Sequence, residues 1–246
     1  MTDCEVPINQ ELLTKVLAGI SPDSVLVGGQ ALAFWVSHYG VQLPAVFSGA
    51  ISDDADILGQ RADVLEIAKR VHGAPELASG RVISALVGQV RIPVRTGEYV
   101  NVDVLHKLVG VEPDKVRERA SEVTLGDITF LVMHPIDVLH SRIENLAKLK
   151  DKQTPQGIEQ AKLSLLVANR YTQECAAEGD DGQRHATKVI EHIVSIPKSS
   201  AGRRTARDFG IDFLVALPVF AIQAEQFRTI RWPQILKELA KAAECA

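Results

Sequence analysis

The chain has 246 residues, of which 46% are hydrophobic, so it exceeds one typical domain and can bury a packed core. Its formal net charge of −4 argues against a basic surface that binds nucleic acid indiscriminately. Three scattered cysteines without CxxC spacing indicate reduced thiols. The N-terminus lacks the pattern of a signal peptide, and no stretch is apolar enough to span a bilayer, so we expect a soluble, cytoplasmic protein with no membrane partner.

The first part of the chain predicts a helix, a strand and a second helix. Apolar residues recur at three- and four-residue spacing over residues 9–20, behind an asparagine cap, which is typical of an amphipathic helix. The β-branched run at 25–27 then meets Gly28-Gly29 and passes directly into an apolar segment at 30–38. This pattern indicates a strand, a tight turn and a buried helix.

The middle of the chain predicts further strands. Residues 40–51 lack periodicity and predict a loop, which leads to a strand at 55–58 and a helix at about 61–72. Alternating apolar residues predict two more strands, at 82–94 and 99–105, joined by a turn. These elements indicate a small mixed sheet with helices packed on it.

The composition changes after a last predicted strand at 128–132. From there onward only helical periods occur, at about 135–149, 156–176, 183–196, 203–217 and 233–244. We therefore predict an α/β (α+β) fold, in which a domain of mixed sheet and helices at 1–132 precedes an all-helical domain at 133–246.

Three aspartates in strand-like segments indicate metal chemistry. Alternate side chains of a strand share a face, so Asp54 and Asp56 would project from one side of their strand. Converging carboxylates repel one another, and a hard divalent cation relieves that repulsion, so we expect Mg2+. If the strand that carries Asp103 lies beside theirs, the three acids can bind two ions for in-line displacement at phosphorus.

Each motif also has a simpler interpretation. An Asp-x-Asp pattern occurs by chance in many chains, and residues 52–56 could form an acidic loop. Gly28-Gly29 could be an ordinary turn from strand to helix. Its functional interpretation is that glycines permit close backbone approach and that the following helix N-terminus binds an anion such as phosphate.

The two motifs together resemble the polymerase-β-type nucleotidyltransferase superfamily. Its Gly-Gly or Gly-Ser turn ahead of a Thr/Ser-x-Asp-x-Asp strand is similar to Val27-Gly28-Gly29-Gln30-Ala31-Leu32 followed by Ser52-x-Asp54-x-Asp56-Ile57. The closest resemblance is to AbiEii-like nucleotidyltransferases, many of them toxins of bacterial toxin–antitoxin pairs. It implies a minimal nucleotidyltransferase domain, followed by a helical domain that helps to bind the nucleotide.

The resemblance also assigns roles to individual residues. The metal ligands and catalytic acids would be Asp54, Asp56 and Asp103. The nucleotide would contact Gly28, Gly29, Gln30 and Ser52. The chain departs from the family pattern in two places, because the stretch between the glycines and the first paired acid is long, and because Asp53 adds a charge that would repel a triphosphate.

Polar residues on the first predicted helix of the second domain are further candidates for nucleotide binding. Arg142 and Lys148 would bind the triphosphate, and Ser141 and Asn145 would hydrogen-bond to sugar or phosphate. The simpler alternative is a solvated helix face with local ion pairs to Glu144 and Asp151.

We therefore expect an enzyme, a magnesium-dependent nucleotidyltransferase that moves NMP from NTP to a hydroxyl acceptor. The acceptor would be RNA such as tRNA, or a protein, and a role as the toxin of a toxin–antitoxin pair would add an antitoxin as partner. Two alternatives stay open: an inactive relative that binds a nucleotide or a partner, and an enzyme that modifies a small molecule such as an antibiotic. Magnesium-dependent NTP binding without pyrophosphate release would identify the first, and an acidic acceptor cleft would favour the second.

Overall fold

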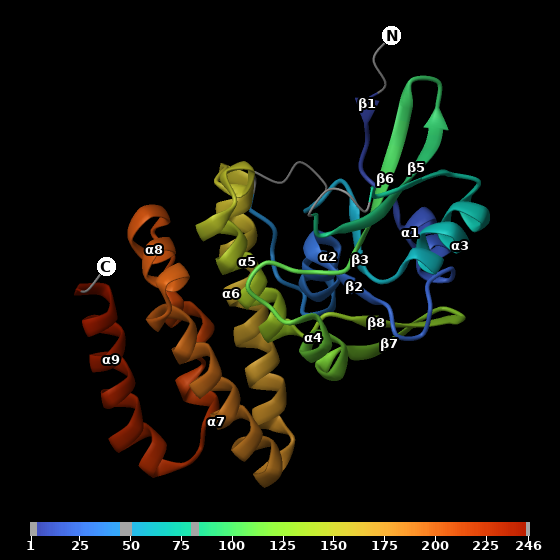
Figure 1. The fold of residues 1–246 in the computed structure, drawn as a ribbon. Coiled ribbons are helices and arrows are strands. Elements are labelled where there is room, and N and C mark those ends of the chain that lie inside the picture. The colour runs from blue at the N-terminus through green and yellow to red at the C-terminus, as the bar shows by residue number, and fades with distance from the viewer. Residues whose placement is uncertain (1–3, 45–50, 80–83, 245–246) are drawn as a thin grey trace. The chain divides into compact units, whose positions relative to one another are not determined.

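The computed structural model describes residues 4–44, 51–79 and 84–244 (Figure 1). Parts of the loop expected at 40–51 and the start of the strand expected at 82–94 lie outside the described residues. The predicted fold class is confirmed, because a mixed sheet of eight strands is combined with many helices. The chain forms two compact units, Met1–Phe34 with Phe47–Val138, and Trp35–Val46 with Leu139–Ala246.

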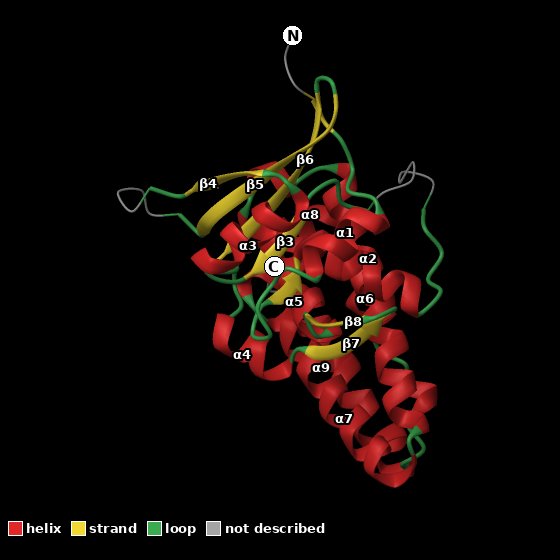
Figure 2. Cartoon of the chain, turned by 90° about the vertical axis from the view of Figure 1, so that its right-hand side faces the viewer, coloured by secondary structure: helices red, strands yellow, loops and turns green. Residues whose placement is uncertain are grey.

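The sheet belongs to the first unit and runs in the order β4-β5-β6-β3-β2-β8-β7, with β1 paired to β6. Its strands are β1 (Cys4–Glu5), β2 (Val25–Val27), β3 (Ala55–Leu58), β4 (Ala74–Leu77), β5 (Leu86–Arg95), β6 (Glu98–Leu105), β7 (Ser121–Leu125) and β8 (Ile128–Val132). The expected turn lies between β5 and β6, which form a long antiparallel hairpin (Figure 2). The sequence did not predict β1, β4 or β7, which are short or lie at an edge and lack a clear apolar alternation.

Short helices complete the first unit: α1 (Gln10–Leu17), α3 (Arg61–Val71) and α4 (Pro113–Arg119). The predicted cap of α1 is confirmed, since the side chain of Asn9 accepts a hydrogen bond of 2.9 Å from the backbone N–H of Leu12. The chain passes between the two units within α2 (Gly28–His38) and within α5 (Pro135–Lys148).

Side chains of strands β3 and β6 alternate between a buried apolar face and a polar face of the sheet. Ala55 and Ile57 of β3 are fully buried, as are Val102 and Val104 of β6. The residues that alternate with them include Asp56 of β3 and Asp103 of β6, which are both only half-buried. A strand with period-two alternation buries one face only, so the apolar residues anchor the sheet and fix the direction of the polar face.

The second unit is helical. It contains the end of α2, most of α5, and the helices α6 (Pro155–Ala177), α7 (Gly179–Ser195), α8 (Ser200–Phe209) and α9 (Trp232–Glu244), with short 3-10 and π segments between them. The helix expected at 203–217 is wrong beyond Phe209, because Gly210 adopts φ 64° and caps α8. Within the described part of the chain, none of the helices combines the length and apolar character that crossing a bilayer requires.

The side chain of Asp63 connects the start of α3 to the segment before β2 through hydrogen bonds. This carboxylate is 2% exposed and accepts three hydrogen bonds, from the backbone N–H groups of Ser21 (2.7 Å) and Gln60 (2.7 Å) and from the hydroxyl of Ser24 (2.9 Å). We expect Asp63→Ala to lower the free energy of unfolding by about 2–4 kcal/mol, because it leaves buried donors unsatisfied. Urea denaturation measures this. Glu66→Ala, an exposed acid on the same helix, should change it by less than about 0.5 kcal/mol.

Asp137 predicts a pH-dependent contribution to stability. It is 1% exposed and accepts a hydrogen bond of 2.7 Å from Arg119, yet burial outweighs this partner and raises the pKa of its carboxyl to about 6. The folded state therefore holds this proton more tightly than the unfolded state, so stability falls as pH rises from about 4 through 6. Relative to Asp137→Asn, the wild type should lose about 1–3 kcal/mol across that range. A difference between the two proteins that stays constant with pH would contradict this.

Candidate metal centre

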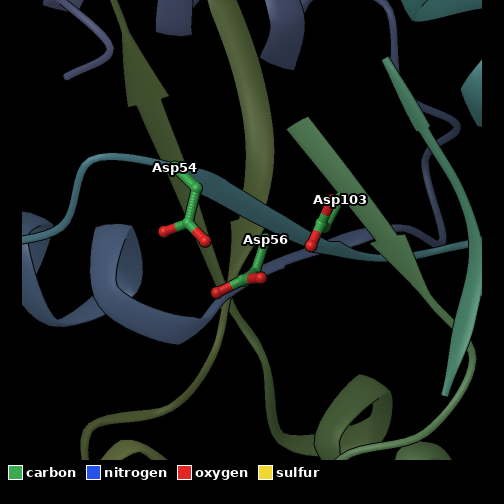
Figure 3. Close-up of side chains that lie close together, drawn as sticks. All are labelled: Asp54, Asp56 and Asp103. Carbon is green, nitrogen blue, oxygen red and sulfur yellow. The ribbon is translucent and has the colours of Figure 1, made fainter. Parts of the chain in front are cut away.

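Three carboxylates converge at the polar face of the sheet. Asp56 on β3 lies directly opposite Asp103 on β6 in a parallel pair, and Asp54 immediately precedes β3. Each offers one oxygen, and these oxygens all lie within 4.8 Å of one another. Figure 3 shows the three side chains gathered at one place, with Asp54 and Asp56 extending from the same side of the chain. The structure thus brings together the three acids that the sequence singled out, from two adjacent strands.

Gln30 and Ser52 lie beside the first of these acids. The hydroxyl of Ser52 donates a hydrogen bond of 2.8 Å to Oδ1 of Asp54. The side-chain amide of Gln30 donates to the backbone carbonyl of Ser52 at 2.9 Å. Gln30, on the first turn of α2, therefore holds the segment that delivers Asp54, and both residues adjoin the cluster without showing a role in nucleotide binding.

Two carboxamides that the sequence analysis missed contact the third acid. Asn101 Nδ2 donates to Oδ1 of Asp103 at 2.7 Å, and Gln89 Nε2 donates to the same oxygen at 3.2 Å. Asn101 precedes Asp103 by two residues, so strand alternation alone could have placed the two side chains on one face. Gln89 could not have been found in this way, because its position depends on the β5–β6 register.

Gly28 and Gly29 lie in close contact with Asp56 and Ser52. Gly28 has φ 67°, and a Cβ atom added there would lie 1.9 Å from Oδ2 of Asp56. A Cβ atom at Gly29 would lie 2.3 Å from the Oγ atom of Ser52. Only glycine fits at Gly28, both for its backbone conformation and for the space that the carboxylate occupies. The turn is therefore required for packing around Asp56, whether or not it also binds phosphate.

The surroundings of the cluster are strongly negative. Burial raises the pKa of the Glu5 carboxyl on β1 above its ordinary value, and the charges of three aspartates raise it further: Asp54, Asp103 and Asp53. Arg91 lowers this pKa but does not cancel the effect. The pKa of a carboxyl on the strand paired with β6 is thus raised by the excess negative charge, which a bound cation would reduce.

The residues present fit a hard divalent cation. All three ligands would be carboxylate oxygens, which Mg2+ and Mn2+ prefer, whereas zinc sites usually contain histidine or cysteine. Octahedral ligation at about 2.0–2.1 Å sets neighbouring ligand oxygens about 3 Å apart and opposite ones about 4 Å apart. Small side-chain rotations would bring the observed oxygens from within 4.8 Å to those separations.

The expected nucleotide-binding residues of α5 belong to the second unit. Arg142 donates a hydrogen bond of 3.2 Å to the side chain of Gln160, and Lys148 forms an ion pair of 2.5 Å with Glu144. The Lys148 contact is the local ion pair that the simpler interpretation expected. A role of Arg142, Asn145 and Lys148 in nucleotide binding stays a prediction.

No protein-family model matches this chain, and no curated protein matches its sequence. The function is therefore inferred from the carboxylates and their neighbours.

The contact between Gly28 and Asp56 predicts a selective effect on metal binding. If the three carboxylates bind a cation, Gly28→Ala should weaken Mn2+ binding roughly 10–100-fold, because the new Cβ atom would displace the carboxylate of Asp56. Gly126→Ala is the matched control, since Gly126 also has a positive φ (60°) but no atom within 4 Å of an added Cβ. Both variants should lose about 1–3 kcal/mol of stability through backbone strain. Isothermal titration with Mn2+ separates them, and equal affinities would contradict the proposed packing.

Proposed function

We propose that this protein is a magnesium-dependent nucleotidyltransferase that transfers a nucleoside monophosphate from an NTP to a hydroxyl acceptor. The observation that carries the proposal is the convergence of Asp54, Asp56 and Asp103 within 4.8 Å, on the polar face of the sheet. Holding three like charges so close is costly unless a cation compensates them. A structural role alone gives no reason for this arrangement.

The proposed reaction replaces the phosphoanhydride bond between the α- and β-phosphates of the NTP by a phosphoester bond to the acceptor, whose hydroxyl loses its proton. The acceptor oxygen forms a bond to the α-phosphorus as the bond from that phosphorus to the bridging oxygen breaks, and pyrophosphate leaves. Asp54, Asp56 and Asp103 would hold two Mg2+ ions. When bound, these ions supply charge neutralisation and activation of the hydroxyl.

Other residues beside the three aspartates would bind the phosphates of the nucleotide and position Asp54. The start of α2 lies next to the cluster, since Gly28 contacts Asp56, and a helix N-terminus favours a bound phosphate. Ser52 and Gln30 would hold Asp54 in its place through their hydrogen bonds. These contacts support a rigid site that exists before the nucleotide binds.

The proposed acceptor is RNA such as tRNA, or a protein, and the resemblance to AbiEii-like proteins favours a toxin with an antitoxin as partner. A second candidate is a cationic small molecule, such as an aminoglycoside antibiotic. The observation that favours it is the extra negative charge of Glu5 and Asp53 near the three proposed ligands, which would attract ammonium groups and repel a polynucleotide. Labelled NTP incubated with total RNA, with protein and with aminoglycosides distinguishes these acceptors.

Replacing a single ligand should abolish transfer without unfolding the protein. Asp54→Asn and Asp56→Asn should each slow pyrophosphate release by roughly 100-fold or more, because a ligand charge worth several kcal/mol in the transition state is lost. Asp53→Asn is the matched control, as it changes an exposed acid next to the cluster that is not a proposed ligand and should not lower the rate.

The assay uses each of the four NTPs with Mg2+ and measures pyrophosphate. Unchanged release by both ligand variants would refute the assignment of the site. Magnesium-dependent NTP binding by the wild type without pyrophosphate release, with any of the acceptors, would instead identify a binding protein that has lost catalysis.

A further inference from the structure

Two neutral side-chain amides donate hydrogen bonds to one oxygen of Asp103. Gln89 on β5 is the residue directly opposite Asp103 in the antiparallel β5–β6 pair. Asn101 lies two residues earlier on β6 and so shares the face of Asp103. Their side-chain N–H groups both donate to Oδ1, at 3.2 Å from Gln89 and 2.7 Å from Asn101. All three side chains are half-buried on the polar face of the sheet.

The two hydrogen bonds fill the acceptor positions of that oxygen. A carboxylate oxygen has about two lone-pair sites, and each amide occupies one of them. The opposite orientation of either amide would set its carbonyl oxygen against the carboxylate, which repels. Ligation of a cation by Asp103 would therefore use its other oxygen, Oδ2.

We propose that Gln89 and Asn101 are positioning residues that make Asp103 a one-oxygen ligand and thereby favour Mg2+ over Ca2+. This inference rests on the proposed metal centre. Mg2+ requires near-ideal octahedral geometry and bonds to carboxylates through single oxygens, whereas Ca2+ accepts six to eight oxygens and commonly takes both oxygens of one carboxylate. Because Oδ1 accepts the two amide hydrogen bonds, Asp103 could not bind a cation through both of its oxygens.

The chemistry of these side chains suits the role. An arginine or lysine in either position would orient Asp103 equally well, but its positive charge would repel the metal ion. A carboxamide donates hydrogen bonds without a net charge, so it fixes the carboxylate and leaves its attraction for a cation intact. The sheet register holds both donors, because Gln89 and Asp103 face each other across paired strands.

The test measures Mn2+ binding by electron paramagnetic resonance on the full chain, with Ca2+ as competitor. The variants are Gln89→Met, Asn101→Leu and the double variant, and the control is Gln10→Met, an exposed amide on α1. The double variant should bind Mn2+ at least roughly 10-fold more weakly, with each single variant intermediate. The ratio of Mn2+ to Ca2+ affinity should fall in the same order, and the control should match the wild type.

Further measurements separate positioning from a general structural role. Asn101→Gln keeps an amide donor and should recover part of the Mn2+ affinity that Asn101→Leu loses. In pyrophosphate release, the metal concentration for half-maximal rate should rise in the double variant, while the rate at saturating Mg2+ recovers. A lowered rate that no metal concentration restores would overturn the positioning role.

The failure of this inference is distinguishable from failure of the proposed function. If the wild type binds Mn2+, Asp103→Asn removes that binding, and the double variant keeps both affinity and metal preference, then the amide role is overturned and the metal centre stands. If the wild type binds neither Mn2+ nor Mg2+, the metal centre and the inference that rests on it both fall.

Discussion

The repulsion among three aspartates is the constraint around which the first unit is organised. Asp56 and Asp103 face each other across paired strands, and Asp54 adds a third charge at the start of β3. The apolar residues on the reverse of these strands are fully buried, and their burial stabilises a sheet whose other face carries concentrated negative charge. Core packing thus supports an arrangement that electrostatics alone would disperse.

The groups next to the three acids constrain them by shape and by neutral hydrogen bonds. Gly28 leaves room for Asp56, Ser52 donates to Asp54, and two carboxamides donate to Asp103. Each contact fixes a carboxylate without adding a fixed positive charge. A site built in this way would keep its attraction for a cation, which is the property that the proposed magnesium-dependent transferase needs.

The second unit is held together by different means. The segment Trp35–Val46 is joined to the long helix α6 by the hydroxyl of Tyr39, which donates a hydrogen bond of 2.9 Å to Glu174. Trp35 is buried, and its ring stacks on that of Tyr39. On α5, Glu144 is 6% exposed and pairs with Lys148, which gives this lysine a structural role independent of any nucleotide.

The sequence by itself determined the mixed fold class, most helices and the central strands, because their apolar periods of two and 3.6 residues are local properties. It also identified Asp54, Asp56 and Asp103, since acids in strand patterns stand out against apolar neighbours. Only the tertiary structure decided that β3 runs parallel to β6 with Asp56 opposite Asp103, because strand pairing joins segments far apart in the chain and no local pattern encodes its register. For the same reason, Gln89 and the contact between Gly28 and Asp56 emerged only once the strands were paired and the turn was packed against them.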